Sequence, residues 1–231
     1  GFLINKKNIK DIKSFSNGNW WVQDFSSFFP LYNLELKRSY KKFLDACASP
    51  GGKSFQLLSK NQNLLLNDKS FSRIKILESN LNRLNFKTKI SNKDFIKFND
   101  SEKYDFIIVD APCSAIGTIR KNPEIFFKTK PPNLNELSIL QKNMLEKASN
   151  LLNRNGLILY MVCSFLKRET VNQINSFLTS HRNFQLYKFD LLNQNKEYSK
   201  LITDNYMLTL PDTVSNYNID GYFAAYLKKV K

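Results

Sequence analysis

The sequence has no apolar run approaching the roughly 20 residues that a membrane-spanning helix needs, and its N-terminus lacks the charged-then-apolar layout of a signal peptide. Cysteine and histidine are scarce: the chain holds three cysteines, with no CxxC spacing, and one histidine. This composition predicts neither a disulfide framework nor a zinc site. We therefore expect a soluble, cytoplasmic protein in a reducing setting, without a bound metal, and we expect it to be monomeric.

Acidic residues are few beside basic ones. The chain carries 35 Lys and Arg against 20 Asp and Glu, which gives a formal charge of +15. A positive field of this size attracts polyanions, so nucleic acid is the favoured partner. A Lys- and Asn-rich composition also fits codon usage alone, and an anionic membrane surface is the weaker alternative because no basic amphipathic helix stands out.

The length of 231 residues and a hydrophobic content of 42% are sufficient for a substantial core. Residues 1–30 are typical of an irregular lead-in segment, with a helix capped near Asp24. The pair Trp20 and Trp21 is more typical of a core or interface contact than of ligand stacking. The chain begins with Gly1 rather than Met, which favours a piece of a longer protein.

From Lys42 onward, short apolar runs alternate with helical patterns. The predicted strands cover residues 43–46, 64–66, 87–90, 106–109, 157–162, 184–189 and 222–227. The predicted helices are one ending at Leu58 and those over 70–84, 135–152 and 169–179, with Asn155-Gly156 closing the third as a C-terminal cap. This alternation predicts right-handed βαβ crossovers and an α/β fold, with a mostly parallel seven-stranded sheet and helices on both faces.

The stretch Asp110-Ala111-Pro112-Cys113-Ser114 follows a buried strand that Pro112 ends in a rigid turn. Open α/β sheets bind their ligands outside the carboxyl ends of the strands, so a carboxylate and a thiol at this position indicate a site. The connection over 113–132 is rich in Lys, Pro and Asn, and it is the candidate substrate-facing loop.

The turn after the first predicted strand reads Cys47-Ala48-Ser49-Pro50-Gly51-Gly52-Lys53-Ser54. It is not a Walker P-loop, because that motif needs glycine where this chain has Cys47, and the dinucleotide pattern GxGxxG is absent too. Two glycines before a helix N-terminus still allow close backbone approach. The turn therefore predicts a cradle for a nucleotide-like ligand that need not carry phosphates.

Three carboxylates, Asp68, Asp94 and Asp110, follow successive predicted strands. Asp68 is placed to bind both hydroxyls of a ribose, and Asp94 is placed to meet an adenine amino group. S-adenosylmethionine fits this layout, since it has a ribose, an adenine and a cationic sulfonium but no phosphate. Each aspartate taken singly is more typical of a helix cap or a turn, whereas their joint placement favours ligand binding.

Cys113 and Cys163 follow neighbouring predicted strands, so their thiols should lie close together. A thiolate with a lowered pKa beside a lysine and a helix N-terminus is a competent nucleophile. Lys53 and the helix starting near Glu169 are placed to supply both to Cys163. Cys47 is interpreted as an inert buried thiol.

Together these residues resemble the RNA 5-methylcytosine methyltransferases, specifically the bacterial ribosomal RsmB (Fmu/Sun) type. The resemblance covers nearly the whole chain and rests on residues 45–54, 110–114 and 160–164 and on the flanking motifs 21–24 and 220–223. It implies a Rossmann-like, S-adenosylmethionine-dependent methyltransferase domain over residues 31–231. Residues 1–30 would then be the end of an N-terminal RNA-binding region.

The resemblance also implies roles for individual residues. Cys163 matches the family's nucleophile, Cys113 the cysteine that helps release the product, and Asp110 a residue beside the methionyl group and the target base, while Lys53 helps to order the site. The implied cofactor contacts are Cys47, Ala48, Ser49, Pro50, Gly51, Gly52, Lys53, Asp68, Asp94 and Asp110. Candidates to hold the RNA backbone are the basic residues of the 113–132 connection, Arg120, Lys121, Lys128 and Lys130.

The chemistry explains why such a site needs two thiols and a carboxylate. Carbon 5 of cytosine is too weak a nucleophile to take a methyl group directly, so a thiolate must first add to carbon 6. Cys163 would make that attack, Asp110 would bind N3, and Cys113 would assist the final elimination. The cytosine must leave its stack to reach the thiol.

Three departures from the family pattern leave every reacting group in place. The chain has Met161-Val162 where the family commonly has Ser-Thr, Glu169-Thr170 where it has Glu-Asn, and Ala115 where it has Gly. We expect methylation of cytosine carbon 5 in small-subunit ribosomal RNA. The alternatives are the same chemistry on transfer RNA and a catalytically silent RNA-binding or ribosome-assembly factor.

Overall fold

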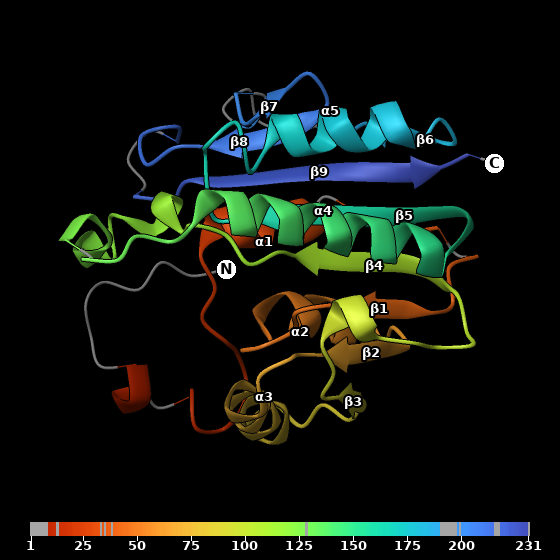
Figure 1. Cartoon of the computed structure of the whole chain (residues 1–231). Coiled ribbons are helices and arrows are strands. Elements are labelled where there is room, and N and C mark those ends of the chain that lie inside the picture. Colours follow the sequence, from red (N-terminus) through yellow and green to blue (C-terminus); the bar gives the residue numbers. More distant parts are fainter. Residues whose placement is uncertain are drawn as a thin grey trace.

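The computed structural model describes residues 9–12, 14–32, 34, 36–37, 39–127, 129–189, 198, 200–214 and 218–230. Within these residues the chain forms a nine-stranded sheet in the order β3-β2-β1-β4-β5-β9-β8-β7, with β6 also paired to β9 (Figure 1). The strands are β1 (Phe43–Asp45), β2 (Leu64–Asn67), β3 (Lys89–Ser91), β4 (Tyr104–Asp110), β5 (Leu152–Val162), β6 (Phe184–Tyr187), β7 (Ile202–Thr203), β8 (Tyr206–Thr209) and β9 (Tyr222–Lys229).

The predicted α/β class is confirmed, but the sheet has two more strands than predicted. Strands β7 and β8 form a hairpin through Asp204 and Asn205, whose φ angles are 49° and 68°. Two successive residues with positive φ suit a tight hairpin turn, which usually carries glycine and here does not. The missing glycine signal and the two-residue length of β7 explain why the sequence pattern did not predict this hairpin.

The pairing direction changes at β5. Strands β1 to β5 pair in parallel, whereas β9 runs antiparallel to β5, β6 and β8. The sheet is therefore parallel on one side of β5 and antiparallel on the other, which makes it less parallel than predicted. The parallel half brings the carboxyl ends of β1 to β5 to one edge.

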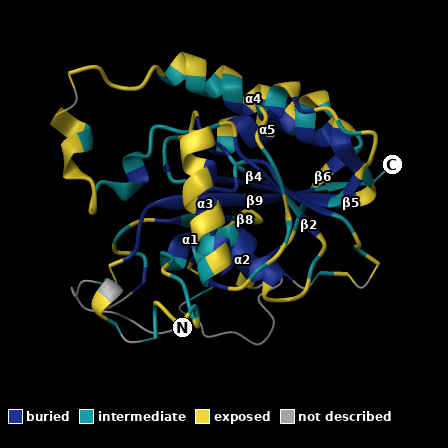
Figure 2. Cartoon of the chain, turned by 90° about the horizontal axis from the view of Figure 1, so that it is seen from below, coloured by how far each residue is buried: buried dark blue, intermediate teal, exposed yellow. Residues whose placement is uncertain are grey.

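Helices cover both faces of the sheet, as predicted (Figures 1 and 2). Buried apolar residues form two clusters, and β4 contributes to both: Phe106 and Ile108 join one cluster, Ile107 and Val109 the other, because side chains alternate across a strand. No helix among the described residues is long and apolar enough to cross a membrane. The α-helices are α1 (Phe25–Tyr32), α2 (Gly52–Leu58), α3 (Phe71–Arg83), α4 (Leu134–Leu151) and α5 (Val171–Ser180).

The first helix begins where the sequence indicated. The Asp24 carboxylate accepts a hydrogen bond from the Ser26 amide at 3.0 Å, which satisfies one of the free N–H groups at the start of α1. Helix α1 crosses the predicted segment boundary at residue 30. Its Phe29 and Leu31 side chains are buried in the same apolar cluster as β1 and β4.

The predicted helix cap at Asn155-Gly156 is wrong. Helix α4 ends at Leu151, and Leu152 already pairs with Tyr104 as the first residue of β5. The register then shifts, so that Phe106 pairs with Leu157 and the intervening residues of β5 are extra. Asn155 has a φ of 64°. Both a strand bulge and a helix C-cap place a residue in this left-handed conformation, so the Asn155-Gly156 pair is compatible with either.

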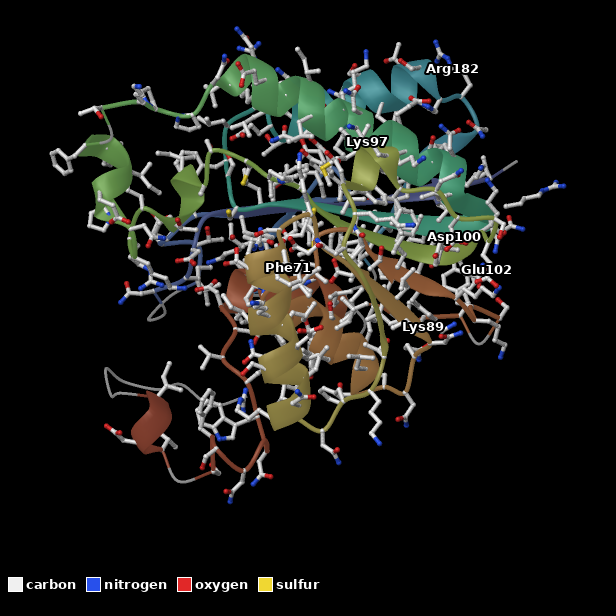
Figure 3. The ribbon with its side chains drawn as sticks, turned by 60° about the horizontal axis from the view of Figure 1, so that its bottom comes forward. Phe71, Lys89, Lys97, Asp100, Glu102 and Arg182 are labelled. Atoms are coloured by element: carbon white, nitrogen blue, oxygen red, sulfur yellow. The ribbon has the colours of Figure 1, made fainter. Side chains whose placement is uncertain are left out.

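The two edges of the sheet differ in what they carry. The short connections before the parallel strands lie at the amino edge, where Figure 3 shows Lys89, Asp100 and Glu102. Phe71, in the first turn of α3, lies toward the opposite edge. The cysteines and aspartates named above follow the carboxyl ends of the strands, so the candidate site lies at that edge.

Candidate active site

The two strand-end thiols are in contact. Cys113 follows β4 and Cys163 follows β5, and the Cys113 Sγ and Cys163 Sγ atoms are 3.4 Å apart. Strands β4 and β5 are direct neighbours in the sheet, and their register places Asp110 opposite Met161. The predicted proximity of the two thiols is therefore confirmed.

A lysine and a carboxylate lie beside this thiol pair. Lys53 Nζ is 2.6 Å from Asp110 Oδ2, and the Tyr222 hydroxyl donates to Asp110 Oδ1 at 2.8 Å. Lys53 Nζ also lies 5.6 Å from the centre of the Tyr222 ring. The ion pair is more than half-buried, so solvent weakens it little. Tyr222 belongs to the 220–223 motif, for which the sequence alone predicts no role at this residue, and the structure places its hydroxyl beside Asp110.

The environment separates the acidities of the two thiols. The pKa of Cys163 is lowered, first by the hydrogen bond from Cys113, and the Lys53 charge adds to this against burial and the Asp110 charge. The pKa of Cys113 is raised well above its usual value by the same hydrogen bond and by burial. Cys163 is thus the thiol that ionises more readily, and Cys113 is the one that keeps its proton.

Lys53 keeps its positive charge despite burial. Burial alone favours the neutral amine, but attraction to Asp110, their hydrogen bond and the Asp45 charge together raise the pKa of Lys53. The site therefore contains a fixed cation close to the thiol that has the lowered pKa.

The turn over residues 47–53, here called the cradle, wraps closely around the start of α2. Gly51 has a φ of 116°, and a Cβ atom there would lie 2.0 Å from the Phe55 ring. Only glycine fits this position. The Ser49 hydroxyl oxygen is buried and has no hydrogen-bond partner within the described part of the chain, which marks a polar group left for a ligand. Burial raises the pKa of Cys47 strongly, in line with an inert thiol.

Asp68 contacts the cradle, Asp94 follows β3, and both have partners within the protein. The Asp68 carboxylate, buried at the end of β2, accepts from the Ser49 and Ser70 amides at 3.2 and 2.9 Å. Asp94 accepts from the Ile96 amide at 3.2 Å and pairs with Lys69 at 2.8 Å. Both residues therefore make the contacts that are typical of a helix cap or a turn. A ligand would bind to the lone pairs of their carboxylate oxygens that these contacts leave free.

A fourth strand-end carboxylate is Asp45, for which the sequence alone predicts no role. It is the last residue of β1, the strand between β2 and β4. It accepts hydrogen bonds from the Ser54 hydroxyl at 2.6 Å and the Cys47 amide at 3.3 Å. Burial raises the pKa of Asp45 to about 6. Sequence reasoning missed it because the residue lies inside an apolar strand, where the pattern indicates only burial.

We expect an Asp45→Asn variant to be more stable than the parent at pH 8 but not at pH 4. The pKa of Asp45 rises from 3.8 to about 6 on folding, so the unfolding free energy of the parent falls as pH rises from about 4 through 6. The resulting difference above pH 6 is on the order of 3 kcal/mol, at about 1.4 kcal/mol per pKa unit. Thermal melts of the ligand-free protein across this pH range measure it.

Asp105→Asn is the matched control, since backbone and Asn153 hydrogen bonds outweigh burial and lower the pKa of Asp105 in the folded chain. Its difference from the parent should have the opposite sign, be complete above about pH 4 and shrink only at lower pH, so it should stay constant where the Asp45 difference changes. An Asp45→Asn variant whose stability relative to the parent does not change with pH would contradict a raised pKa.

The 113–132 connection is held against the site by two glycines. The Gly117 amide donates to the Cys163 carbonyl at 3.0 Å, and the Gly221 amide donates to the Gly117 carbonyl at 2.8 Å. A Cβ atom on Gly117 would lie 1.9 Å from the Gly221 carbonyl oxygen. Ala115, where the family commonly has glycine, adopts a φ of 59°. This left-handed conformation explains why the family commonly has glycine at this position. Alanine destabilises the folded chain there by roughly 1–2 kcal/mol.

The predicted RNA-binding residues divide into two groups. Arg120 and Lys121 belong to an ion-pair cluster with Asp24 and Asp220, in which Lys121 Nζ lies 2.6 and 2.7 Å from the two carboxylates. These two basic side chains therefore tie the connection to the lead-in and to the approach to β9. Lys130 is exposed and stands outside this cluster, and Lys128 lies outside the described residues.

Among the described residues, no group of three or more His, Cys, Asp or Glu side chains is placed to hold a metal ion. The chemistry available at this edge is that of two thiols, a lysine–aspartate pair and buried carboxylates. Such a set serves nucleophilic attack and proton transfer.

Comparisons with known proteins identify the relatives of this chain. Residues 32–228 match the family described as 16S rRNA methyltransferase RsmB/F. The chain is 31% identical over 232 residues to ribosomal RNA small subunit methyltransferase B of Shewanella oneidensis, covering 98% of the chain and 52% of that relative. The chain thus spans about half the length of the curated relatives it matches.

Solved structures share the fold. The crystal structure of PH0851 matches with a TM-score of 0.84 and 31% identity, covering 97% of this chain and 50% of that one. NSun6 from Pyrococcus horikoshii, solved with SFG, matches with a TM-score of 0.81 and 24% identity, covering 98% and 57%. The second likeness bears on the fold alone, and both confirm the predicted Rossmann-like methyltransferase fold. From the family match and the identity to its members, we conclude that this chain belongs to the RsmB/F family of 16S rRNA methyltransferases.

Proposed function

We propose that this chain transfers a methyl group from S-adenosylmethionine to carbon 5 of a cytosine in small-subunit ribosomal RNA, through a covalent adduct between Cys163 and carbon 6. The observation that carries the proposal is the contact of two thiols of unequal acidity, Cys113 and Cys163, beside the Lys53–Asp110 ion pair. Its relatives are ribosomal RNA small subunit methyltransferases B and F, which supports ribosomal RNA as the substrate.

Each reacting group has a step in this scheme. The Cys163 thiolate adds to carbon 6, which makes carbon 5 electron-rich enough to accept a methyl group. Asp110, steadied by Tyr222, stabilises the proton at N3 as the ring loses aromaticity. Once Cys163 is bonded to carbon 6, Cys113 gives up its own proton, which N3 takes up, and the Cys113 thiolate then takes the proton from carbon 5. The carbon 6–sulfur bond breaks, which restores the ring and the Cys163 thiolate, and the N3 proton leaves to solvent.

The cradle fits S-adenosylmethionine, which supplies the methyl group when bound. The unpartnered Ser49 hydroxyl and the glycines of the cradle allow a ligand to lie against the backbone. The strand-end carboxylates Asp68, Asp45 and Asp110 suit a ligand with a ribose and a positive charge. Asp68 would hold the ribose, Asp94 the adenine and Asp110 the methionyl end, with the rest of the 47–53 turn lining the ligand.

RNA would approach over the 113–132 connection, which runs out from the site and away from the body of the molecule (Figures 1 and 2). Its 3-10 helix η4 (Pro123–Phe127) exposes Phe126 and Phe127, which are 69% and 82% accessible. Exposed aromatic rings stack on unpaired bases, and the net charge of +15 attracts the phosphates. Arg120, Lys121, Lys128 and Lys130 remain our candidates for the backbone contacts, in a cytoplasmic setting.

The experiment that tests the proposal is methyl transfer to purified RNA. The chain is incubated with S-adenosylmethionine and either deproteinised small-subunit ribosomal RNA or transfer RNA, and 5-methylcytosine is mapped by bisulfite sequencing. We expect one or a few protected cytosines in the ribosomal RNA. Protection confined to transfer RNA would identify the alternative substrate. No cofactor binding in calorimetry and no methylation of either RNA would leave a silent RNA-binding factor.

A further inference from the structure

A buried carboxylate that the proposed chemistry does not use lies directly behind the two thiols. Glu169 stands in the turn between β5 and α5 and is fully buried. Within the described part of the chain it makes no ion pair. A buried carboxylate is costly unless other groups donate hydrogen bonds to it, so its contacts indicate what it is there for.

The Glu169 carboxylate receives hydrogen bonds from the residues that follow both cysteines. Oε1 accepts from the Ser114 amide at 2.8 Å, and Oε2 accepts from the Ser114 and Ser164 hydroxyls, each at 2.6 Å. Ser114 and Ser164 also contact each other, with 3.4 Å between their hydroxyl oxygens. One side chain thus joins the loop after β4 to the loop after β5.

Two further contacts fix Glu169 itself. Gln141 on α4 donates from its amide nitrogen to Glu169 Oε1 at 3.2 Å and to the Pro112 carbonyl at 3.0 Å. The Tyr160 hydroxyl donates to the Glu169 carbonyl at 2.8 Å. The carboxylate is therefore held from α4 and β5 at once, and it has little freedom to follow a moving loop.

We propose that Glu169 is a positioning residue that holds the Cys113 and Cys163 thiols against each other through the serine that follows each cysteine. The importance of this contact for catalysis rests on the proposed function, in which one thiol attacks and the other takes a proton from the same ring. Misplacing a reacting group by about 1 Å costs on the order of 100-fold in rate, so a fixed spacing matters there.

The test measures the spacing of the thiols without RNA or cofactor. An azodicarboxamide oxidant accepts two electrons and two protons from Cys113 and Cys163 as they form a disulfide, and mass spectrometry of the linked peptides gives its rate. The two sulfurs must close from 3.4 Å to about 2.05 Å, so the rate depends on how they are held. We expect Glu169→Gln to slow this reaction at least about 10-fold.

Two controls separate positioning from other effects. The first control is the rate at which iodoacetamide alkylates Cys163, measured in Cys113→Ala and in Cys113→Ala with Glu169→Gln. The two rates should differ less than about 2-fold, because alkylation needs a single thiol. Glu78→Gln, an exposed carboxylate on α3, should change neither rate. If Glu169→Gln does not fold, Ser164→Ala removes one of the serine contacts and should slow the disulfide rate by a smaller factor.

A folded Glu169→Gln or Ser164→Ala variant that forms the disulfide at the parental rate overturns the inference. So does an equal loss of disulfide formation and alkylation, which would show a general change in reactivity. Because the disulfide assay contains neither RNA nor cofactor, its result can still be interpreted if the methylation proposal fails. The converse also holds, since methyl transfer is measured separately.

Discussion

A Cys113→Ala variant is expected to accumulate a covalent protein–RNA complex that survives denaturing electrophoresis. With Cys163 intact, the thiolate still adds to carbon 6 and the methyl group is still transferred, but the group that takes the carbon 5 proton is gone. Methylated RNA therefore stays attached, and turnover falls by about 10²–10⁴-fold, the usual contribution of a general base. Gel mobility with labelled RNA, with and without S-adenosylmethionine, measures the adduct.

The second cysteine supplies the control. Cys163→Ala should give neither adduct nor product, and the double variant should resemble Cys163→Ala rather than Cys113→Ala. Cys47→Ala is the matched thiol replacement. The pKa of Cys47 is strongly raised, so this thiol should not attack the RNA, and Cys47→Ala should accumulate no adduct. An adduct that persists in the double variant would show that neither thiol is the nucleophile assigned to it.

Asp110→Asn is expected to lower the turnover number by about 10²–10³-fold, the size found when one preorganised electrostatic group is removed. The asparagine keeps the shape of the side chain but loses the charge that holds Lys53 at 2.6 Å. It also loses the group assigned to the N3 proton. Single-turnover methyl transfer at saturating RNA measures the effect, and adduct formation should fall with it because N3 is stabilised before the methyl group moves.

Two variants calibrate this result. Tyr222→Phe removes only the 2.8 Å hydrogen bond to Asp110 and should cost about 10-fold, near the value of one hydrogen bond to a charged group. Glu102→Gln lies at the opposite edge of the sheet, where the side chain pairs with Lys42 in solvent, and should leave turnover unchanged (Figure 3). If Asp110→Asn loses no more than Tyr222→Phe, the carboxylate is not the group that acts on N3.

The asymmetry of the two thiols links these expectations. Cys113 and Cys163 share one hydrogen bond, and the same contact raises the pKa of one thiol and lowers that of the other. Nearby Lys53 favours the thiolate at Cys163, whereas the Glu169 charge adds to the raised pKa of Cys113. The order of attack and release in the proposed function follows from this difference rather than from the identity of the residues.

Local patterns determined the order of the elements and the edge of the sheet where the site lies. Short apolar runs that alternate with helical periods predict strands β1 to β6 and β9 and their order along the chain. Chain connectivity then places the ends of parallel strands together, so Asp110, Cys113 and Cys163 were expected at one edge from the sequence alone. Their contact distance and their acidities were not available at that stage, since both depend on neighbours from other strands.

Only the tertiary structure assigned Asp45, Tyr222 and Glu169 to the site. Asp45 and Tyr222 lie in apolar strands, and Glu169 lies in the turn between β5 and α5. For all three, the sequence pattern indicates nothing about the hydrogen-bond partner. The tertiary structure also showed that Arg120 and Lys121 form ion pairs with Asp24 and Asp220, which lie about 100 positions away in the sequence. Composition counts charges but does not pair them. Pairing is decided by packing, because a half-buried charge takes the nearest opposite charge that folding brings to it.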